Sequence, residues 1–417
     1  MDQQMEDILR TYEGRFDVRP AFFREKPPEN LCLVIAIPCF KEPDVISTLD
    51  SLKACVPPSG DVEVIVAVNA PESAAEDVLQ ANQQTLQQLD YWRKTNRCSY
   101  LKLLIVGEEK LPDRSAGAGL ARKLAMDEGL RRWVQAGEDG PILCLDADCV
   151  VSPDYLVAAE EAFSQKQVKL GHFQFSHTWR NESDRALQTG IIAYELHLRC
   201  FIQGLKWAGY PFATHTVGSC MAVRASSYAR SGGMNKRKAG EDFYFMHKLL
   251  PLGGYADLSA TVFPSCRVSD RVPFGTGRAQ LEWTSGQRGM QSYSIEVFLV
   301  LKTFFNLTSG FFRQDIDGLV LPSPLRGILE RLSFGPRLIQ FRKESKTESI
   351  FFKKFWTWMD GFMVLKLVHH LRDHGCPNQP ILSVSEQLIR FYQHESVPID
   401  LEIPRLREDL LQLINRS

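Results

Sequence analysis

The first strong pattern in the chain consists of two continuous apolar runs separated by an amphipathic stretch. The β-branched and apolar run LCLVIAIP at 31–38 is typical of a strand buried on both faces. The segment VISTLDSLKAC at 45–55 places apolar residues on one helical face, and a second apolar run, VEVIVAVNA, follows at 62–70. A strand, a helix and a strand in succession predict a βαβ unit, and therefore a parallel, doubly wound sheet.

The same alternation continues to about residue 150. We predict a third strand at 100–108 (YLKLLIVGE), a helix at 119–137 and a fourth strand at 141–148 (PILCLDAD). Ligands of open α/β sheets bind beyond the carboxyl ends of the strands. The polar tips PCFKE, NAPE, GEE and DAD are therefore expected to converge on one crevice.

Two carboxylates, Asp146 and Asp148, stand at the end of the fourth predicted strand. In an extended segment, side chains two residues apart lie on one side, roughly 6.5 to 7 Å apart along the chain. Both carboxylates would then face one pocket, where they could hold a hydrated hard cation completed by a ligand's phosphate oxygens. A simple turn, or a cap of the next helix at Ser152, is the alternative that the pair alone leaves open.

Composition narrows the class of protein. The 417 residues are 44% hydrophobic and 24% charged, which predicts one or two globular domains. Lys plus Arg (49) nearly balances Asp plus Glu (50), so we expect no nucleic-acid partner. The ten cysteines show no CxxC spacing, the acidic N-terminus lacks the features of a signal peptide, and no apolar window reaches membrane-spanning length. A cytoplasmic protein with reduced thiols is the expectation.

Several motifs occur together in one order. They are VIAIPCFKEPDVISTLDSL, GLARKLAMDEG, LDADC, GSCMAVRASSYARSGGM and AGEDFYFMHKL, and they span about residues 30 to 250. In this order and at this spacing they resemble the inverting family 2 glycosyltransferases of GT-A fold. Each motif is common by itself, whereas the combination is specific.

The resemblance implies a Rossmann-like α/β domain, with a mostly parallel sheet and flanking helices, at residues 29–280. A helical extension at 1–28 precedes it and a mainly α-helical region at 281–417 follows. The implied activity is metal-dependent transfer of a hexosyl-type group from a UDP- or GDP-sugar to a hydroxyl of a saccharide or lipid-linked acceptor, with inversion, in cell-envelope glycan or glycolipid synthesis. Two alternatives stay open: a sugar nucleotidyltransferase, which would be expected to carry a Gly-rich loop where this chain has CFKEPD, and a non-catalytic nucleotide-sugar binding module.

The resemblance also implies roles for the four carboxylates of the motifs. Asp148 would ligate Mg²⁺ or Mn²⁺ between the donor's phosphates, and Asp146 would contact the ribose or a metal-bound water. Asp242 would be the general base that takes the acceptor hydroxyl's proton, with Glu241 orienting the acceptor or a neighbouring loop. For Glu241 and Asp242 the alternative is a helix start whose charges are favoured by the dipole.

Further residues would bind the donor. Asn69 stands where the family usually has an aspartate that contacts uracil, and because an amide both donates and accepts, the nucleobase stays open. Arg122 and Lys123 either lie near the diphosphate or form a solvated helix face. The remaining donor-binding residues implied are Pro38, Phe40 and Glu42 around the base and ribose, Arg114 near the diphosphate, and Gly218 and Ser219 under the sugar. Independently of the resemblance, Arg271 and Arg278 lie in the Gly-containing loop 266–280, which could close over a diphosphate, bind a phosphorylated acceptor or be a surface loop with ordinary salt bridges.

From about residue 281 the family pattern fades, and the absence of its Gln-x-x-Arg-Trp motif argues against a processive polysaccharide synthase. Segment 349–373 mixes aromatic and basic residues. It either makes peripheral contact with the inner face of a membrane or packs on a partner domain.

Overall fold

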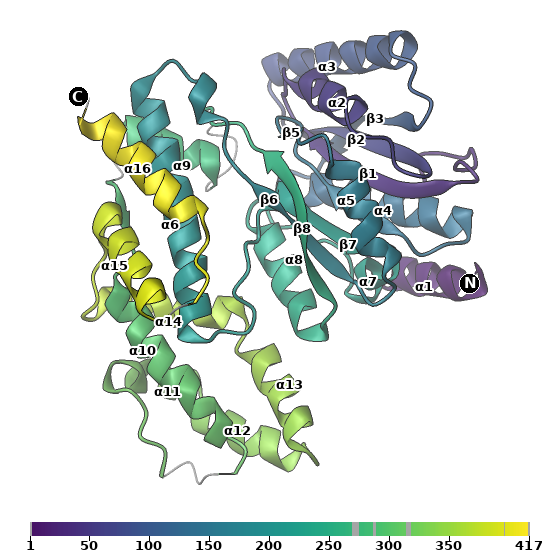
Figure 1. The fold of residues 1–417 in the computed structure, drawn as a ribbon. Helices are drawn as coiled ribbons and strands as arrows, with labels where there is room; N and C mark the ends of the chain where they lie inside the picture. Colours follow the sequence, from purple (N-terminus) through teal and green to yellow (C-terminus); the bar gives the residue numbers. More distant parts are fainter. Residues whose placement is uncertain (1, 269–274, 287–288, 314–317, 396, 416–417) are drawn as a thin grey trace. The chain divides into compact units, whose positions relative to one another are not determined.

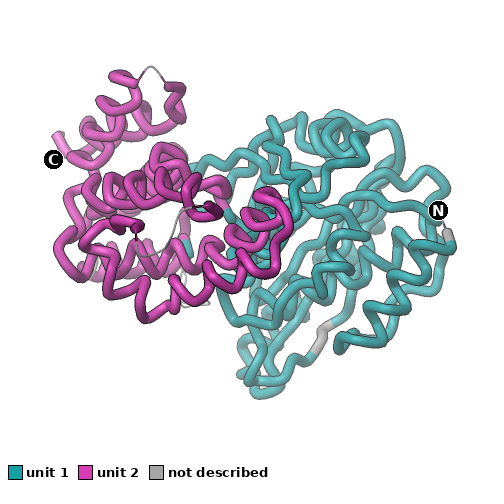
Figure 2. Tube along the Cα trace, turned by 90° about the horizontal axis from the view of Figure 1, so that it is seen from below, with its two compact units in different colours: residues 1–178, 216–265, 270–275 teal, residues 179–215, 266–269, 276–417 magenta. Residues whose placement is uncertain are grey.

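The computed structural model describes residues 2–268, 275–286, 289–313, 318–395 and 397–415 (Figure 1). The chain divides into two compact units (Figure 2). Unit 1 comprises residues 1–178, 216–265 and 270–275, and unit 2 comprises 179–215, 266–269 and 276–417. Segment 179–215, which falls within the predicted α/β range 29–280, is thus part of the helical unit; the domain ranges themselves stay a prediction.

An eight-stranded sheet forms the centre of unit 1, in the order β3-β2-β1-β4-β7-β6-β8-β5 (Figure 1). The strands are β1 (Leu31–Cys39), β2 (Asp61–Pro71), β3 (Leu101–Leu111), β4 (Pro141–Cys144), β5 (Val150–Val151), β6 (Leu170–Phe175), β7 (Met221–Arg224) and β8 (Tyr255–Phe263). Strands β1 to β4 pair in parallel, as the apolar runs predicted. Strand β7 runs antiparallel to both β4 and β6, and β5 antiparallel to β8, so the whole sheet is mixed.

Seven helices are described in unit 1: α1 (Asp2–Arg15), α2 (Val45–Lys53), α3 (Glu76–Thr95), α4 (Ala118–Ala136), α5 (Tyr155–Ser164), α7 (Ala225–Arg230) and α8 (Glu241–Leu249). Strands β1 and β2 are almost wholly buried, because helices cover the sheet and leave these apolar runs no contact with water. The α/β architecture with flanking helices is confirmed.

The N-terminal helix α1 is joined to α4 and α7 through a buried polar network. The hydroxyls of Tyr12 and Tyr228 donate to Asp127 Oδ1 over 2.7 and 2.6 Å, and Lys123 Nζ donates to Asp127 Oδ2 over 2.6 Å. Lys123 is 3% exposed, so it does not lie on a solvated helix face. A buried charge that is paired and hydrogen-bonded in this way fixes one docking position for α1.

In its described residues, the regular structure of unit 2 is helical apart from one short ladder. Its helices are α6 (Arg185–Ala208), α9 (Thr276–Thr284), α10 (Ile295–Asn306), α11 (Arg326–Arg331), α12 (Phe334–Lys343), α13 (Glu348–Trp358), α14 (Gly361–Asp373), α15 (Ile381–His394) and α16 (Glu402–Asn415). Strands β9 (Gln291–Ser292) and β10 (Gln379–Pro380) pair antiparallel. The predicted helical C-terminal region is confirmed.

The aromatic residues of segment 349–373 serve the core of unit 2. Phe351 and Phe355 are fully buried, and the apolar face of α14 packs into the same cluster. Of the two sequence alternatives, packing within the protein therefore accounts for these aromatics. In the described part of the chain, we find no helix with the length and apolar character needed to cross a membrane.

Candidate functional site

Arg122, in the first turns of α4, joins two motifs that lie far apart in the sequence. Its Nη2 donates to Asp146 Oδ1 over 2.6 Å, and its Nη1 donates to Glu241 Oε1. Arg122 is 3% exposed and Glu241 4% exposed, whereas the Asp146 side chain keeps 39% of its surface. The arginine thus anchors a buried carboxylate on one side and a partly exposed one on the other.

Asp242 and Gly218 complete the same cluster. A Cβ on Gly218 would lie 2.9 Å from both Arg122 Nη2 and Asp242 Oδ2, so only glycine leaves room for these two side chains to approach. Asp242 Oδ1 accepts a 2.7 Å hydrogen bond from the Phe243 amide at the start of α8. Burial raises the pKa of Asp242 above its ordinary value, the Arg122 cation and the amides of Phe243 and Gly218 oppose that rise, and the Asp146 charge adds to it.

The LDADC segment is a turn and not the end of a strand. Strand β4 ends at Cys144, and the Cys149 amide donates to the Asp146 carbonyl over 3.1 Å. Ala147 is buried, and its carbonyl accepts from Thr48 Oγ1 over 2.9 Å. The extended geometry predicted for Asp146 and Asp148 is therefore wrong, because the backbone turns back after Leu145 to enter β5.

Ser152 does not cap the following helix. Helix α5 begins at Tyr155 with Asp154 in the N-cap position, and the Ser152 hydroxyl donates to the Asp154 carboxylate. The carboxylates of Asp146 and Asp148 thus belong to the turn Asp146–Cys149 and not to a helix cap, and both side chains are partly exposed there.

The carboxylates of the turn fit a divalent ion only if a ligand supplies further oxygens. Within the described residues, no three His, Cys, Asp or Glu side chains gather closely enough to hold a metal ion by themselves. One oxygen of Asp146 already accepts from Arg122. The oxygen donors of Asp146 and Asp148 suit a hard cation such as Mg²⁺ or Mn²⁺ that keeps water and phosphate ligands.

Asn69, at the tip of β2, is bound to the tip of β1. Its Nδ2 donates to the carbonyls of Cys39 over 2.9 Å and Ala67 over 3.4 Å. Its own carbonyl accepts from Asn82 Nδ2 over 2.8 Å. Since the hydrogen bonds described for the side-chain amide use Nδ2, Oδ1 is the group left to accept from a ligand.

The other residues predicted around the nucleoside lie on the first loop. Pro38, in β1, and Phe40, directly after it, are both half-buried. Glu42 is 3% exposed and its Oε1 accepts from the Asp44 amide over 3.0 Å, while its carbonyl accepts from Thr85 Oγ1. Glu42 thus shapes the turn into α2, and a wall formed by Pro38 and Phe40 stays a prediction.

The residues predicted near the diphosphate and under the sugar come from several parts of the chain, and their common role stays a prediction. Arg114 lies exposed in the turn after β3, and Ser219 is buried beside Gly218 in the turn before β7. Arg278 belongs to unit 2, where its Nε pairs with Glu282 over 2.9 Å. Arg271 lies outside the described residues.

The glycines that open α4 serve packing. A Cβ on Gly119 would lie 2.4 Å from the Arg237 carbonyl and 2.9 Å from Glu241 Cβ. This close approach presses the start of α4 against the loop before α8, which carries Glu241 to Arg122. The small residues of SAGAG therefore have a structural reason independent of any phosphate.

Sequence reasoning missed Arg122 as the centre of the cluster. The pattern left it as either a solvated residue or a phosphate contact, because charged residues on helices usually face water. The signal was present in GLARKLAMDEGLRRWV, where apolar residues occur on every side of the helix. Such a helix has no face to offer to water, and residues Gly119 to Trp133 are indeed all buried.

Comparison with known proteins gives structural similarities alone. No family model and no curated protein matches the sequence. Among solved structures, the chain is similar to S. aureus TarS 1-349 in complex with UDP-GlcNAc, at 12% identity over 83% of this chain and 92% of that chain, with a TM-score of 0.39. It is also similar to the mannosyltransferase PcManGT from Pyrobaculum calidifontis in complex with GDP-Man and Mn²⁺ (14% identity, 99% and 92% coverage, TM-score 0.35) and to GalNAc-T7 with UDP, GalNAc and Mn²⁺ (12% identity, 74% and 55% coverage, TM-score 0.35). TM-scores this low do not by themselves assign an activity to this chain.

Proposed function

We propose that this chain is a metal-dependent glycosyltransferase that moves a sugar from a nucleoside-diphosphate donor to an acceptor hydroxyl with inversion. One observation carries the proposal: buried Arg122 ties Asp146 of the LDADC turn to Glu241 of the AGED segment, with Asp242 alongside. Two carboxylate motifs about ninety residues apart thereby meet at the carboxyl end of β4. A nucleotidyltransferase or a binding module gives no reason for the second carboxylate motif, Glu241 and Asp242, to lie beside the first.

Each residue has a chemical task in this proposal. Asp242 takes the proton of the acceptor hydroxyl, for which a raised pKa and a position beside a fixed cation are suitable. Arg122 and Glu241 hold Asp242 and the LDADC turn in place. A divalent ion bound through Asp148 and Asp146 would supply positive charge for the departing diphosphate.

Asn69 bears on the donor nucleobase in this proposal. Asn69 is 4% exposed, and because Nδ2 is used within the protein, Oδ1 would accept from a ring N–H of the base. Uracil and guanine both have such a ring N–H, whereas the corresponding nitrogen of cytosine is an acceptor and would oppose Oδ1. We propose a UDP- or GDP-sugar, and not a CDP-sugar, as the donor.

The proposal is tested by incubating the full chain with UDP-sugars, GDP-sugars and Mn²⁺ and identifying the products. Release of nucleoside diphosphate supports a transferase, pyrophosphate chemistry supports a nucleotidyltransferase, and binding without turnover supports a binding module. We expect Asp242→Asn to bind the donor but lose transfer, and Asp148→Ala to weaken Mn²⁺-dependent donor binding. Asp90→Asn, on the exposed face of α3, is the matched control, and a fully active Asp242→Asn enzyme would refute the base assignment.

A lipid-linked acceptor in cell-envelope synthesis, and contact with the cytoplasmic face of a membrane near residues 349–373, belong to the same proposal. The outward face of α13 supports it, because Ile350 is 43% exposed and Lys353 is exposed one turn further on. Sedimentation with vesicles that contain anionic lipid tests the contact. Binding that is unchanged in the Ile350→Ser/Lys353→Glu variant would exclude this face.

A further inference from the structure

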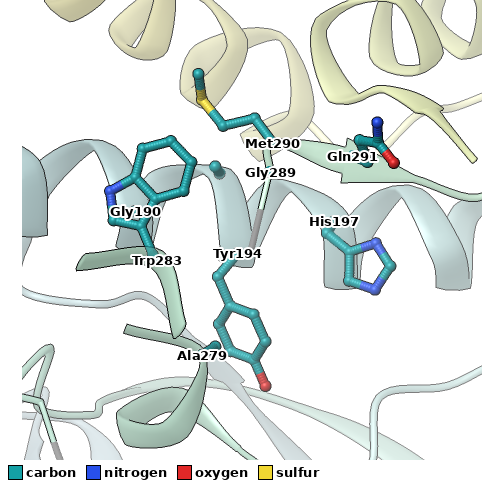
Figure 3. A pocket seen from close by; sticks show the side chains of 9 residues that line it. Gly190, Tyr194, His197, Ala279, Trp283, Gly289, Met290 and Gln291 are labelled. Carbon is teal, nitrogen blue, oxygen red and sulfur yellow. The ribbon is translucent and has the colours of Figure 1, made fainter. Parts of the chain in front are cut away.

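Unit 2 contains a small pocket that none of the predicted site residues lines. It lies between α6, α9 and the segment that enters β9, and it is open to solvent. Figure 3 shows the indole of Trp283, the phenol of Tyr194 and the imidazole of His197 around this space. These three side chains are only half-buried, so part of each remains exposed at the mouth of the pocket.

One face of α6 forms the floor and one wall. Gly190, Ala193, Tyr194 and His197 recur at the spacing of successive helical turns, so they share that face. The first two are small and buried, and the next two are larger. The helix thus presents a shallow floor that is bounded by an aromatic ring and an imidazole.

Trp283 is held rigidly against this floor. Its Nε1 donates to the Ala186 carbonyl over 2.8 Å, and a Cβ on Gly190 would lie 2.4 Å from its Cδ1. The missing side chain at Gly190 therefore lets the indole lie close to α6. Such a fixed aromatic ring loses little entropy when a ligand packs on it.

Polar groups at fixed positions lie at the other end of the pocket. His197 Nδ1 is 2.9 Å from Ser292 Oγ, and Ser292, in β9, is 1% exposed. Gln291, the neighbouring residue in β9, is exposed and adds an amide to the lining. None of the nine described lining residues is charged, so the chemistry favours a neutral ligand over a phosphate or nucleotide.

We infer that this pocket binds one pyranose ring of a saccharide, the sugar end of the acceptor. A pyranose has a C–H face that packs on an aromatic ring and hydroxyls that exchange hydrogen bonds with imidazole, phenol and amide groups. The enclosed part of the pocket has a volume of about 10 Å³, room for about one water molecule, so the ring would lie across the open mouth, against the aromatic side chains. The assignment to the acceptor rests on the proposed function, whereas the binding of a saccharide does not.

Saturation-transfer NMR on the full chain, without nucleotide, tests the inference. The probes are four methyl glycosides, of α-mannose, β-glucose, β-galactose and β-N-acetylglucosamine, each at millimolar concentration. We expect at least one to bind, with about tenfold weaker affinity in Tyr194→Ala and a smaller loss in Gln291→Ala, an exposed position that does not threaten folding. Tyr91→Ala, at a tyrosine that is 70% exposed on α3, should bind as the wild type does.

Three results would overturn the inference: no saturation of any of the four glycosides, equal affinity in Tyr194→Ala and wild type, or displacement of the glycoside by inorganic phosphate. Parallel titrations with UDP and GDP separate this inference from the proposed function. Glycoside binding with no binding of either nucleotide and no turnover leaves the saccharide site standing and refutes the transferase. Turnover with an acceptor KM that is unaffected in Tyr194→Ala refutes the acceptor site alone.

Discussion

Replacing Arg122 by methionine tests whether the cluster is held together as described. Methionine is close to the length of the arginine stem but has no charge, so Glu241, whose side chain is 5% exposed, keeps a buried charge without its partner. Removing one partner of a buried ion pair costs about 3 to 5 kcal/mol. Asp146 adds little to this cost, because its 39% exposed side chain can be hydrated after the loss.

The double variant Arg122→Met/Glu241→Gln separates charge from packing. Once the buried carboxylate is neutral, most of the lost stability should return, since the unpaired charge is the main source of the cost. Thermal unfolding of the full chain measures both variants. For a unit of this size 1 kcal/mol corresponds to about 2 to 4 °C, so the single variant should lose about 6 to 20 °C in Tm.

Arg93→Met is the matched control. Arg93 lies on α3 with its side chain 49% exposed and pairs with Asp90, an exposed pair of the kind that contributes about 0 to 1 kcal/mol. A loss below about 1 kcal/mol in Arg122→Met would contradict the buried pair. A double variant no more stable than Arg122→Met would show that packing, not charge, sets the cost.

Three further outcomes follow from the same cluster and its surroundings. In the proposed mechanism Asp242 must be deprotonated to act as base, and its burial raises its pKa, so the acid limb of the pH profile of kcat/KM should lie above the ordinary aspartate pKa of about 3.9. The Asp146 charge raises the pKa of Asp242, so Asp146→Asn should move the limb to lower pH. A limb that does not move would exclude Asp242 as the titrating group. Gly218→Ala should reduce kcat by about a hundredfold while circular dichroism stays native, since the new Cβ would lie 2.9 Å from Arg122 and Asp242, and unchanged turnover would contradict this crowding. UDP should bind at least about tenfold more tightly than CDP in calorimetry, and the ratio should approach one in Asn69→Leu; equal binding of the two nucleotides by the wild type would refute the role of Asn69 Oδ1.

A rise in pH affects folding stability and the proposed catalytic role of Asp242 in opposite directions. Because the pKa is raised in the folded state, the folded chain holds this proton at a pH where the unfolded chain has released it. The protonated carboxyl therefore stabilises the fold at low pH, and this contribution is lost as the pH rises through the two pKa values. The pH at which Asp242 is ready to act as base is thus one at which it no longer favours folding.

The first half of the fold was predictable because its strands are buried on both faces. The runs at 31–38 and 62–70 are continuous and apolar, a pattern that helices covering both faces of a parallel sheet require. Strands β5 and β7, with two and four residues, are too short to show a period, so the mixed half of the sheet could not be read in the same way. The end of β4 was misplaced because Leu145 and Ala147 alternate with the two aspartates as in a strand and are both buried, although β4 ends at Cys144 and the backbone turns after Leu145.

The candidate site was predictable as a set of motifs and not as a set of contacts. Asp146, Gly218, Glu241 and Asp242 meet around Arg122 in unit 1, whereas the convergence of the other polar strand tips on one crevice stays a prediction. What joins them is a charged residue in a helix buried on all sides, and single-residue patterns assign such a residue to water. The physical rule that corrects this is that a charge can be buried when it is paired with counter-charges, and the two Nη atoms of Arg122 pair with Asp146 and Glu241.

The position of Arg122 also constrains how the cluster can work. If Arg122 moved toward a ligand, the buried carboxylate of Glu241 would lose its partner, and an unpaired buried charge is costly. Arg122 is therefore better suited to hold the carboxylates than to follow a departing phosphate. The LDADC turn, with Asp146 and Asp148 both partly exposed, is then the part of the cluster that can respond to the donor, while Glu241 and Asp242 stay fixed at the start of α8. In the proposed transferase, such a division would place the donor's charge against the more exposed turn and the acceptor's proton against a fixed base, an arrangement that suits in-line displacement at the anomeric carbon.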